Sequence, residues 1–357
     1  MNNDYNGIVV TCRVRLARNL SGYNFASTLK DRAVAREIVN RTYKLISQFG
    51  DFKLYEMSKI TPEFAEQLKE RYVISEGLKN NTFSGAVAFN EQSSLSVMIN
   101  EEDHIRSQCI LAGENLATAY SRLVPLDRWL NNNLRFCKSQ KYGYITACPT
   151  NLGTGLRASA MMFLPTLTGS DMMNELYQKA KPRGLTIRGV FGEGSKGQSS
   201  LYQISNEVTL GKSEPTIIKD VQSYVAEVAN IEQVNALTYY NKNKLQVEDE
   251  VFRAKAILKN CKLLSYDEFA SLIASVKFGA MLKIIKVNAI SALDDLIIKC
   301  RPAILNASLR SIQSGDNRVI CGVFSDFVLT SNEKENEIVM QAFRAEYVKN
   351  SLNKIIL

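Results

Sequence analysis

Arginines stand in or beside several segments of this chain whose alternating pattern predicts strands. Arg13 and Arg15 lie two residues apart in the segment from Ile8 to Ala17, so a strand would project both side chains from one face. Two neighbouring guanidiniums repel each other unless an anion lies between them. This segment therefore predicts either an anion-binding strand or a solvated basic edge strand.

Three successive carboxylates, Glu101, Glu102 and Asp103, follow a predicted hairpin formed by residues 86–89 and 95–99. Such a run is costly by mutual repulsion unless cations or metal-bound water face it. The alternative is a solvated acidic loop. His104, which comes next, is expected to be a structural histidine with satisfied hydrogen bonds.

Another carboxylate, Glu193, lies between two glycines after the predicted strand 185–191, which carries Arg188. A carboxylate in a flexible glycine-flanked loop can swing over a neighbouring site when a ligand binds. The alternative is a plain surface turn.

Residues 142–147 alternate as a strand and lead into a turn that contains Gly153 and Gly155. The apolar spacing from Leu156 to Leu164 predicts a helix after this turn, with Arg157 near its start. Backbone N–H groups, the positive end of a helix and a guanidinium together suit an anion. An ordinary strand-to-helix turn is the alternative.

Other phosphate-binding and dinucleotide motifs do not account for this turn. Residues 153–158 formally match G-x-G-x-x-A, but Asp171 and Glu175, the available acidic partners, lie in a helical run instead of ending a second strand. The P-loop and protein-kinase motifs are missing as well. Charges of both signs around the turn instead suggest phosphoryl transfer to a cationic acceptor.

Composition limits the class of protein further. The chain has 357 residues, enough for two domains, and its net charge of +8 is scattered along the sequence, which disfavours direct nucleic-acid binding. Seven cysteines without a C-x-x-C pair, together with one histidine, make a zinc site improbable and predict free thiols in the cytoplasm. The start lacks a signal core and no run is long enough to span a membrane.

The pattern of elements predicts an α+β fold, an antiparallel sheet flanked by helices, followed by a mainly helical C-terminal domain. Residues 31–48 and 62–74 have helical spacing, residues 201–210 alternate as a strand, and the chain becomes helical from Ser213 onward. Ser265 and Glu268 form a capping-box pattern. We place the domain boundary near residue 240, giving a catalytic domain over 1–240 and a helical domain over 241–357.

Four motifs give the chain a family resemblance: residues 12–19, 100–106, 147–159 and 188–193 with 201–206. In this order they resemble the catalytic domain of the phosphagen (ATP:guanido) kinases over roughly residues 8–240. The chain is most similar to the bacterial protein arginine kinases, because its first arginine strand starts at Ile8 and the extra helical region follows the catalytic domain. Met161 and Gly194 stand where kinases of small guanidino compounds usually have histidines.

The resemblance implies a role for each site residue. Arg13, Arg15, Arg106, Arg157 and Arg188 would bind the phosphates of ATP. Glu102 and Glu193 would hold the acceptor guanidinium, with Cys148 against it as an electrostatic tuning group, or else as a structural thiol. Glu101 and Asp103 would help place Mg²⁺ through water.

The resemblance also implies partners and function: ATP-dependent phosphorylation of exposed arginines in proteins, among them a stress-gene repressor and damaged proteins destined for a Clp-type protease. A zinc-binding activator protein and a homodimer are implied as well. Cys12 and Ser107 depart from the usual motifs without removing a catalytic group. Met340 and Gln341 stand where an Arg-Asp pair usually begins a segment that reads phosphoarginine, so sensing there is doubtful. The alternatives are a kinase for free arginine or another small guanidino compound, and a catalytically silent adaptor.

Overall fold

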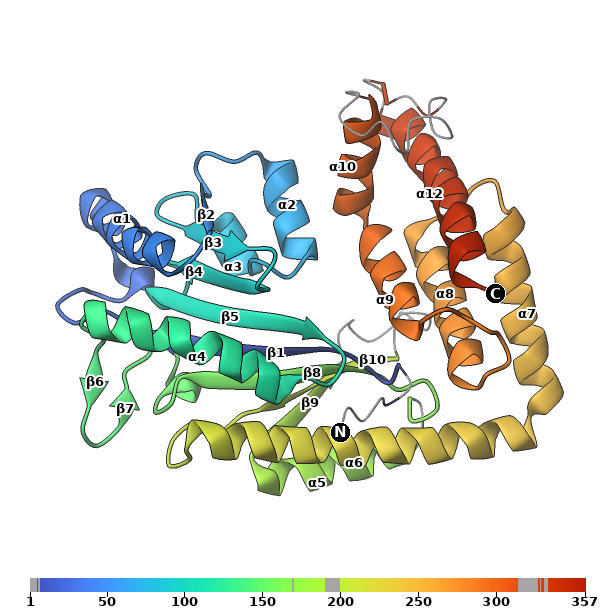
Figure 1. The fold of residues 1–357 in the computed structure, drawn as a ribbon, viewed down its shortest axis with the longest axis horizontal. Coiled ribbons are helices and arrows are strands. Elements are labelled where there is room, and N and C mark those ends of the chain that lie inside the picture. The colour runs from blue at the N-terminus through green and yellow to red at the C-terminus, as the bar shows by residue number, and fades with distance from the viewer. Residues whose placement is uncertain are drawn as a thin grey trace.

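The computed structural model describes residues 5, 7–168, 170–189, 200–313, 327, 329–330 and 333–357. Within these residues an eight-stranded antiparallel sheet is followed by a bundle of helices, as predicted (Figure 1). None of the helices described is long and apolar enough to cross a membrane. The strand order is β2-β3-β4-β5-β1-β8-β10-β9, and it puts β1 between β5 and β8 in the middle of the sheet.

The strands of the sheet are β1 (Val9–Arg18), β2 (Lys53–Glu56), β3 (Ala86–Asn90), β4 (Leu95–Ile99), β5 (Ile105–Ala112), β8 (Leu156–Phe163), β9 (Leu185–Gly189) and β10 (Leu201–Asn206). A separate ribbon pairs β6 (Lys138–Ser139) with β7 (Gly143–Tyr144). The helices before the bundle are α1 (Arg32–Phe49), α2 (Pro62–Glu70), α3 (Glu76–Asn80), α4 (Leu116–Asn133), α5 (Met172–Ala180) and α6 (Glu214–Lys242). The bundle consists of α7 (Lys244–Asn260), α8 (Tyr266–Met281), α9 (Ile290–Lys299), α10 (Pro302–Gln313) and α12 (Glu333–Ile355).

Helix starts follow the capping signals in the sequence. The Thr61 hydroxyl accepts a hydrogen bond from the Phe64 N–H, and Pro62 occupies the first turn of α2. The Ser265 hydroxyl accepts from the Glu268 N–H at the start of α8. These polar caps satisfy N–H groups that have no partner inside the helix, so they fix where each helix begins.

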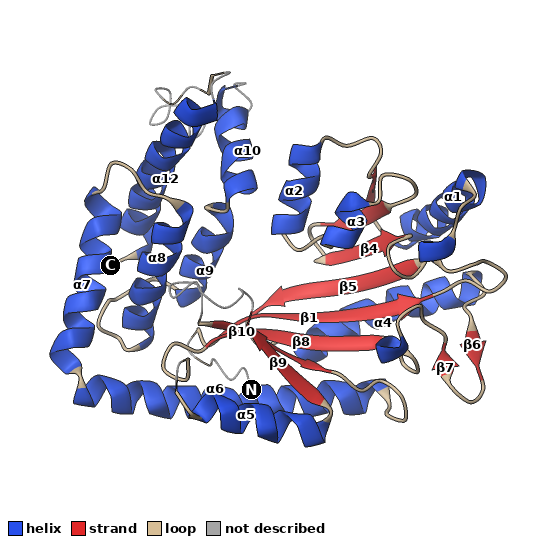
Figure 2. Ribbon diagram, turned by 180° about the vertical axis from the view of Figure 1, so that it is seen from behind, coloured by secondary structure: helices blue, strands red, loops and turns tan. Residues whose placement is uncertain are grey.

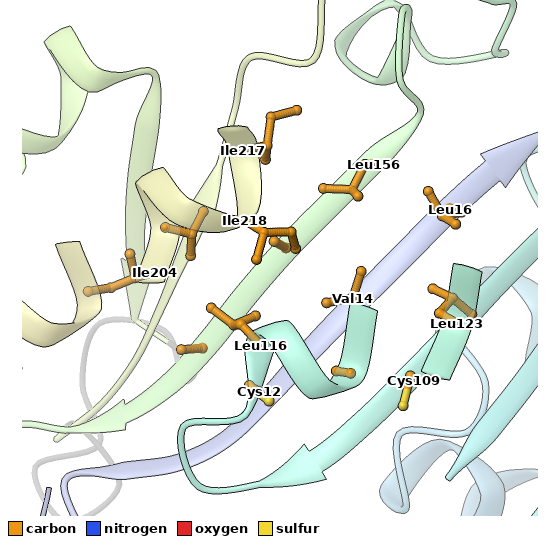
Figure 3. Close-up of a cluster of buried hydrophobic side chains, with 14 of the residues drawn as sticks. Cys12, Val14, Leu16, Cys109, Leu116, Leu123, Leu156, Ile204, Ile217 and Ile218 are labelled. Atoms are coloured by element: carbon orange, nitrogen blue, oxygen red, sulfur yellow. The ribbon is translucent and has the colours of Figure 1, made fainter. Parts of the chain in front are cut away.

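One face of the sheet forms the main hydrophobic core. Cys12, Val14 and Leu16 of β1 are fully buried on this face. Figure 3 shows them gathered with Leu116 and Leu123 of α4 and with apolar residues of α6. Because side chains alternate along a strand, the other face of β1 is left free for polar residues. The core therefore fixes the sheet from one side and leaves the other side available for a site.

The predicted helix after Gly155 is wrong: this segment is strand β8. The apolar residues from Leu156 to Leu164 also fit a second pattern, because Ala158 and Ala160 are buried in the core as well. The buried residues therefore repeat every two positions, as in a strand, instead of every 3.6, as in a helix. Pairing with β1 on one side and β10 on the other satisfies the backbone of β8. Arg157 therefore projects from a strand, and no helix dipole contributes at this position.

The predicted strand over residues 142–147 is also largely wrong, since only Gly143 and Tyr144 pair, with β6. Further along, the N–H of Ala147 donates to the side chain of Asp103 instead of joining a ladder. The strand over 201–210 ends at Asn206. The strand over 185–191 is described as far as Gly189, and the rest of it lies outside the described residues.

The helical bundle stands beside the sheet and is reached through α6, which runs along the sheet and ends where α7 begins (Figures 1 and 2). A second hydrophobic cluster fills the bundle, with Phe269, Leu293 and Val348 among its fully buried members. The change from one core to the other falls near the C-terminal end of α6. We therefore retain residues 1–240 and 241–357 as proposed domains.

Candidate active site

Three arginines form the centre of a basic cluster on the sheet face opposite the main core, which we call the arginine face. The β1–β8 register sets Arg15 directly opposite Arg157. Arg13 precedes Arg15 by two residues and so projects from the same face. The alternation of side chains along β1, together with its pairing to β8, therefore places three guanidiniums together.

Two further arginines join the arginine face from flanking strands. Arg106 precedes Gln108 by two residues on β5, and Gln108 pairs with Arg15. On the far side, Arg188 of β9 pairs with Gln203 of β10, whose register with β8 keeps it on the same face. The sheet thus collects on one surface all the arginines that the sequence motifs singled out.

The charges of this cluster are poorly compensated by the protein. Burial and the nearby guanidinium of Arg106 lower the pKa of Arg13 to about 10. Burial and neighbouring guanidiniums also lower the pKa of Arg15 and of Arg157. The buried Nε of Arg15 has no hydrogen-bond partner among the residues that the structure describes. Partly buried, poorly compensated cations of this kind fit a polyanion such as the triphosphate of ATP.

The acidic loop between β4 and β5 is held firmly at two of its three carboxylates. Glu101 accepts from Arg106 Nη1 at 2.7 Å and from the Ser75 hydroxyl at 2.6 Å. Asp103 is buried, and its Oδ1 accepts from Asn19 Nδ2 at 2.6 Å and from the Ala147 N–H at 2.7 Å. Asp103 therefore ties the acidic loop to the segment that carries Cys148.

Glu102, the third carboxylate, is exposed and lies against Cys148. The Cys148 thiol lies close enough to the Glu102 carboxylate to lower its pKa, and the Cys148 Sγ is 3.0 Å from Thr150 Oγ1. Burial of part of the carboxylate, followed by the charge of Asp103, raises the pKa of Glu102. Arg157 interacts electrostatically with Cys148. The pair thus borders the basic cluster and forms an acidic patch next to it.

The glycine turn makes room for another arginine that the sequence analysis did not single out. Gly155 has φ +63°, and a Cβ at this position would collide with the Ala17 carbonyl and the Arg18 guanidinium. Arg18 donates from Nη1 to the Thr154 carbonyl at 2.7 Å and pairs through Nη2 with Asp127 at 2.9 Å. The sequence signal that was missed is the position of Arg18 on β1: it is an odd number of residues away from Arg13 and Arg15, so its side chain lies on the buried side and not on the arginine face.

His104 has the structural role that was expected. Its Nδ1 accepts from the Leu20 N–H at 3.1 Å, and its Nε2 lies 2.8 Å from the Asn24 carbonyl oxygen. These partners favour the neutral ring with the proton on Nε2. Burial lowers the pKa of His104, which also favours the neutral form.

A pocket of about 220 Å³ opens on the arginine face. Arg13 and Arg188 line it together with Met161 and Tyr72. Met161 is thus placed in a space bounded by the basic cluster. Tyr72 carried no motif, so the sequence analysis missed it.

Two predicted features are limited by what the structure describes. Glu193 and its flanking glycines lie outside the described residues, so the second acceptor carboxylate stays a prediction. Across the described ranges no group of three or more His, Cys, Asp and Glu side chains could hold a metal ion. A Mg²⁺ ion would therefore fit here only with phosphate and water as its main ligands.

Sequence similarity to known proteins covers most of the chain. The family described as ATP:guanido phosphotransferase, C-terminal catalytic domain, matches residues 33–235, and the protein-arginine kinase McsB C-terminal domain matches residues 244–320. The protein-arginine kinase of Clostridium tetani is 37% identical over 354 residues, covering 99% of this chain and 97% of its own length. That of Bacillus pumilus is 37% identical over 302 residues, covering 84% and 83%.

Solved structures of guanidino kinases share the fold. The substrate-free duplicated taurocyamine kinase from Schistosoma mansoni aligns with a TM-score of 0.59 at 26% identity, over 70% of this chain and 38% of its own length. Lombricine kinase aligns with a TM-score of 0.55 at 26% identity, over 64% of this chain and 67% of its own. By sequence and by fold, the chain belongs to the ATP:guanido phosphotransferase family, and within it to the protein arginine kinases.

Proposed function

We propose that the protein phosphorylates arginine side chains of other proteins, using ATP with Mg²⁺. The observation that carries this proposal is the arrangement on the sheet: a cluster of five arginines, whose charges the protein compensates only poorly, lies next to Glu102 and Cys148. A cationic surface for the phosphate donor thus adjoins an anionic surface for a cationic acceptor. Both matching families and the curated relatives support the same reaction.

The chemistry follows from the properties of the two surfaces. An arginine guanidinium is protonated at neutral pH and is a poor nucleophile. Glu102, with Glu193 as the second proposed carboxylate, would hold one guanidinium nitrogen in line with the γ-phosphorus. As the N–P bond forms and the bond between the γ-phosphorus and the β,γ-bridging oxygen breaks, the nitrogen proton passes to a carboxylate and ADP leaves.

The arginine face would stabilise this step by neutralising charge. Arg13, Arg15, Arg106, Arg157 and Arg188 are the proposed ATP ligands. When bound, Mg²⁺ would supply further positive charge to the phosphates, with Glu101 and Asp103 as its proposed indirect ligands. Cys148, which lies beside Glu102, would tune the charge at the acceptor without becoming covalently attached to it.

The test is incubation with Mg·ATP and an unfolded, arginine-rich protein, followed by phosphosite mass spectrometry under non-acidic conditions. We expect acid-labile phosphoarginine from the wild type and none from Glu102→Gln or Glu193→Ala. Absence of phosphoarginine from the wild type would refute the proposal. Rapid ATP turnover with free arginine, and none with protein, would instead establish a small-molecule guanidino kinase.

The cellular role is a further part of the proposal and rests on membership of the family. We expect a stress-gene repressor and damaged proteins bound for a Clp-type protease as substrates in the cytoplasm, with a zinc-binding protein as activator. The six described cysteines are all free thiols, which supports a reducing compartment. Cells carrying Glu102→Gln should lose these phosphosites; an unchanged cellular function in such cells would favour the silent adaptor.

A homodimer is proposed from exposed apolar side chains on the outer helices. Val234 and Leu237 of α6 and Leu245 and Phe252 of α7 are at least half exposed. Exposed large apolar groups of this kind mark protein–protein contacts. Equilibrium sedimentation should give twice the mass of the chain, and Leu245→Glu with Phe252→Glu should shift it to a monomer. A wild-type monomer would refute this point.

A further inference from the structure

Tyr72 is a wall residue of the pocket on the arginine face, and its backbone is held in an uncommon conformation. It follows α2 with φ +60°, a region that non-glycine residues rarely occupy. Its carbonyl accepts from Gln108 Nε2 at 2.8 Å, and Gln108 belongs to the strand register that places the arginines. The side chain lines the pocket together with Arg13 and Met161. The pocket wall at Tyr72 is therefore set by specific contacts.

The side chain of Tyr72 is fixed from the other part of the chain. Arg301, between α9 and α10, donates from Nη2 to the Tyr72 hydroxyl at 2.7 Å, and its guanidinium lies 4.5 Å from the centre of the Tyr72 ring. Arg301 Nη1 donates to the Glu70 carbonyl. In return, the Glu70 carboxylate accepts from the Ala303 and Ile304 N–H groups at the start of α10, at 3.1 Å each. Figures 1 and 2 both show α10 standing beside α2 at this junction.

A second cavity lies behind Tyr72, between the sheet and the helical bundle. Its volume is about 60 Å³, and it is mainly apolar. Tyr266 and Ile297 line it from the bundle, while Tyr72 and Met161 line both this cavity and the pocket on the arginine face. Tyr72, Met161 and Thr11 therefore form a shared wall, so the position of the Tyr72 ring sets the boundary of the pocket on this side.

We propose that Arg301 positions Tyr72 as the wall of the nucleotide pocket, so that docking of the helical bundle sets the affinity for ATP. The identity of the ligand rests on the proposed function, whereas the positioning of Tyr72 by Arg301 rests on the contacts described above. Arg301 acts through Tyr72 and is a positioning residue. Because coupling between two equilibria is reciprocal, bound nucleotide should also strengthen the docking of the bundle on the sheet.

The experiment measures binding of a fluorescent ATP analogue with Mg²⁺ to the full chain, which needs no phosphoryl transfer. Arg301→Ala should raise the Kd about tenfold, which corresponds to about 1.4 kcal/mol. Tyr72→Phe keeps the ring and removes only the hydroxyl that receives Arg301, and it should raise the Kd about threefold. Arg253→Ala is the matched control, because this exposed arginine of α7 pairs with Asp249 of its own helix.

Kinetics separate positioning from a general loss of structure. In Arg301→Ala the KM for ATP should rise with the Kd, while kcat and the KM for the protein substrate stay within about twofold of the wild type. In the Tyr72→Ala background, Arg301→Ala should add nothing further, since its target is gone. Thermal unfolding of each variant identifies any that fails to fold.

Four outcomes would overturn the inference. One is an unchanged Kd in both folded Arg301→Ala and Tyr72→Phe, and another is full additivity of Arg301→Ala with Tyr72→Ala. A fall in kcat with an unchanged KM for ATP would do the same. A wild type that does not bind the nucleotide would also overturn it, whereas normal nucleotide binding without phosphoarginine formation refutes only the proposed function.

Discussion

Removing one guanidinium from the arginine face should stabilise the ligand-free protein while it weakens nucleotide binding. Burial and the nearby Arg106 and Arg157 lower the pKa of Arg13 to about 10, so the folded chain holds this proton less tightly than the unfolded chain does. The charged form therefore costs stability in full at every pH below about 10, and the cost falls only as the pH rises from that value towards the ordinary pKa of arginine.

The size of this cost follows from the shift. At 1.36 kcal/mol for each pKa unit, the lowering corresponds to about 3 kcal/mol for a fully buried group. The Arg13 side chain is only partly buried, so solvent screening reduces the figure to about 1–2 kcal/mol. For a chain of this size, Arg13→Gln should then raise the melting temperature by roughly 2–4 °C without nucleotide.

The assay is thermal unfolding by circular dichroism, with and without Mg·ATP. Nucleotide at 100 times its Kd should stabilise the wild type by about 2.7 kcal/mol and Arg13→Gln much less, so the order of stability reverses. Arg128→Gln, at an exposed position on α4, is the control and should change neither melting temperature by more than about 1 °C. If ligand-free Arg13→Gln melts at or below the wild type, its charge is compensated in the fold and the reasoning is wrong.

Three other perturbations test the remaining electrostatics. Because the pKa of Glu102 is raised, the acid limb of the kcat/KM profile should lie at a higher pH than for an ordinary glutamate, and an acid limb in the ordinary glutamate range would contradict this. Glu102→Gln should abolish activity and slightly raise the free energy of unfolding at neutral pH. The pKa of His104, the single histidine, is lowered by burial, so its stability contribution is complete above about pH 6.5 and falls as the pH drops further. Its lone imidazole resonance in an NMR titration should give a pKa below that value, and a higher one would refute the buried neutral ring. Asp127→Ala leaves buried Arg18 without its closest carboxylate partner and should lower the free energy of unfolding in urea by about 3–5 kcal/mol, whereas Asp249→Ala, in an exposed pair, should cost less than about 1 kcal/mol.

The sequence predicted which arginines share a face better than it predicted the elements around them. Arg13 and Arg15 were placed on one face by strand parity, a local rule that does not depend on the partners of the strand. The segment after Gly155 was misassigned because its apolar residues fit two periods, and only the neighbouring β1 and β10 decide between them. Tyr72 and Arg301 are 229 residues apart, so no local pattern connects them. Glu193 and its loop stay a prediction.

Strand β1 has a consequence for how this enzyme can diversify. Thr11 and Arg13 of this strand line the pocket, whereas Cys12 and Val14, between and beyond them, fill the core. Variation at Thr11 and Gln203, which are only partly buried, can therefore alter which nucleotide or acceptor is preferred at little cost to folding. A combinatorial library restricted to these two positions should yield mostly folded variants with altered specificity, whereas the same diversity at Cys12 and Val14 should yield mostly unfolded chains.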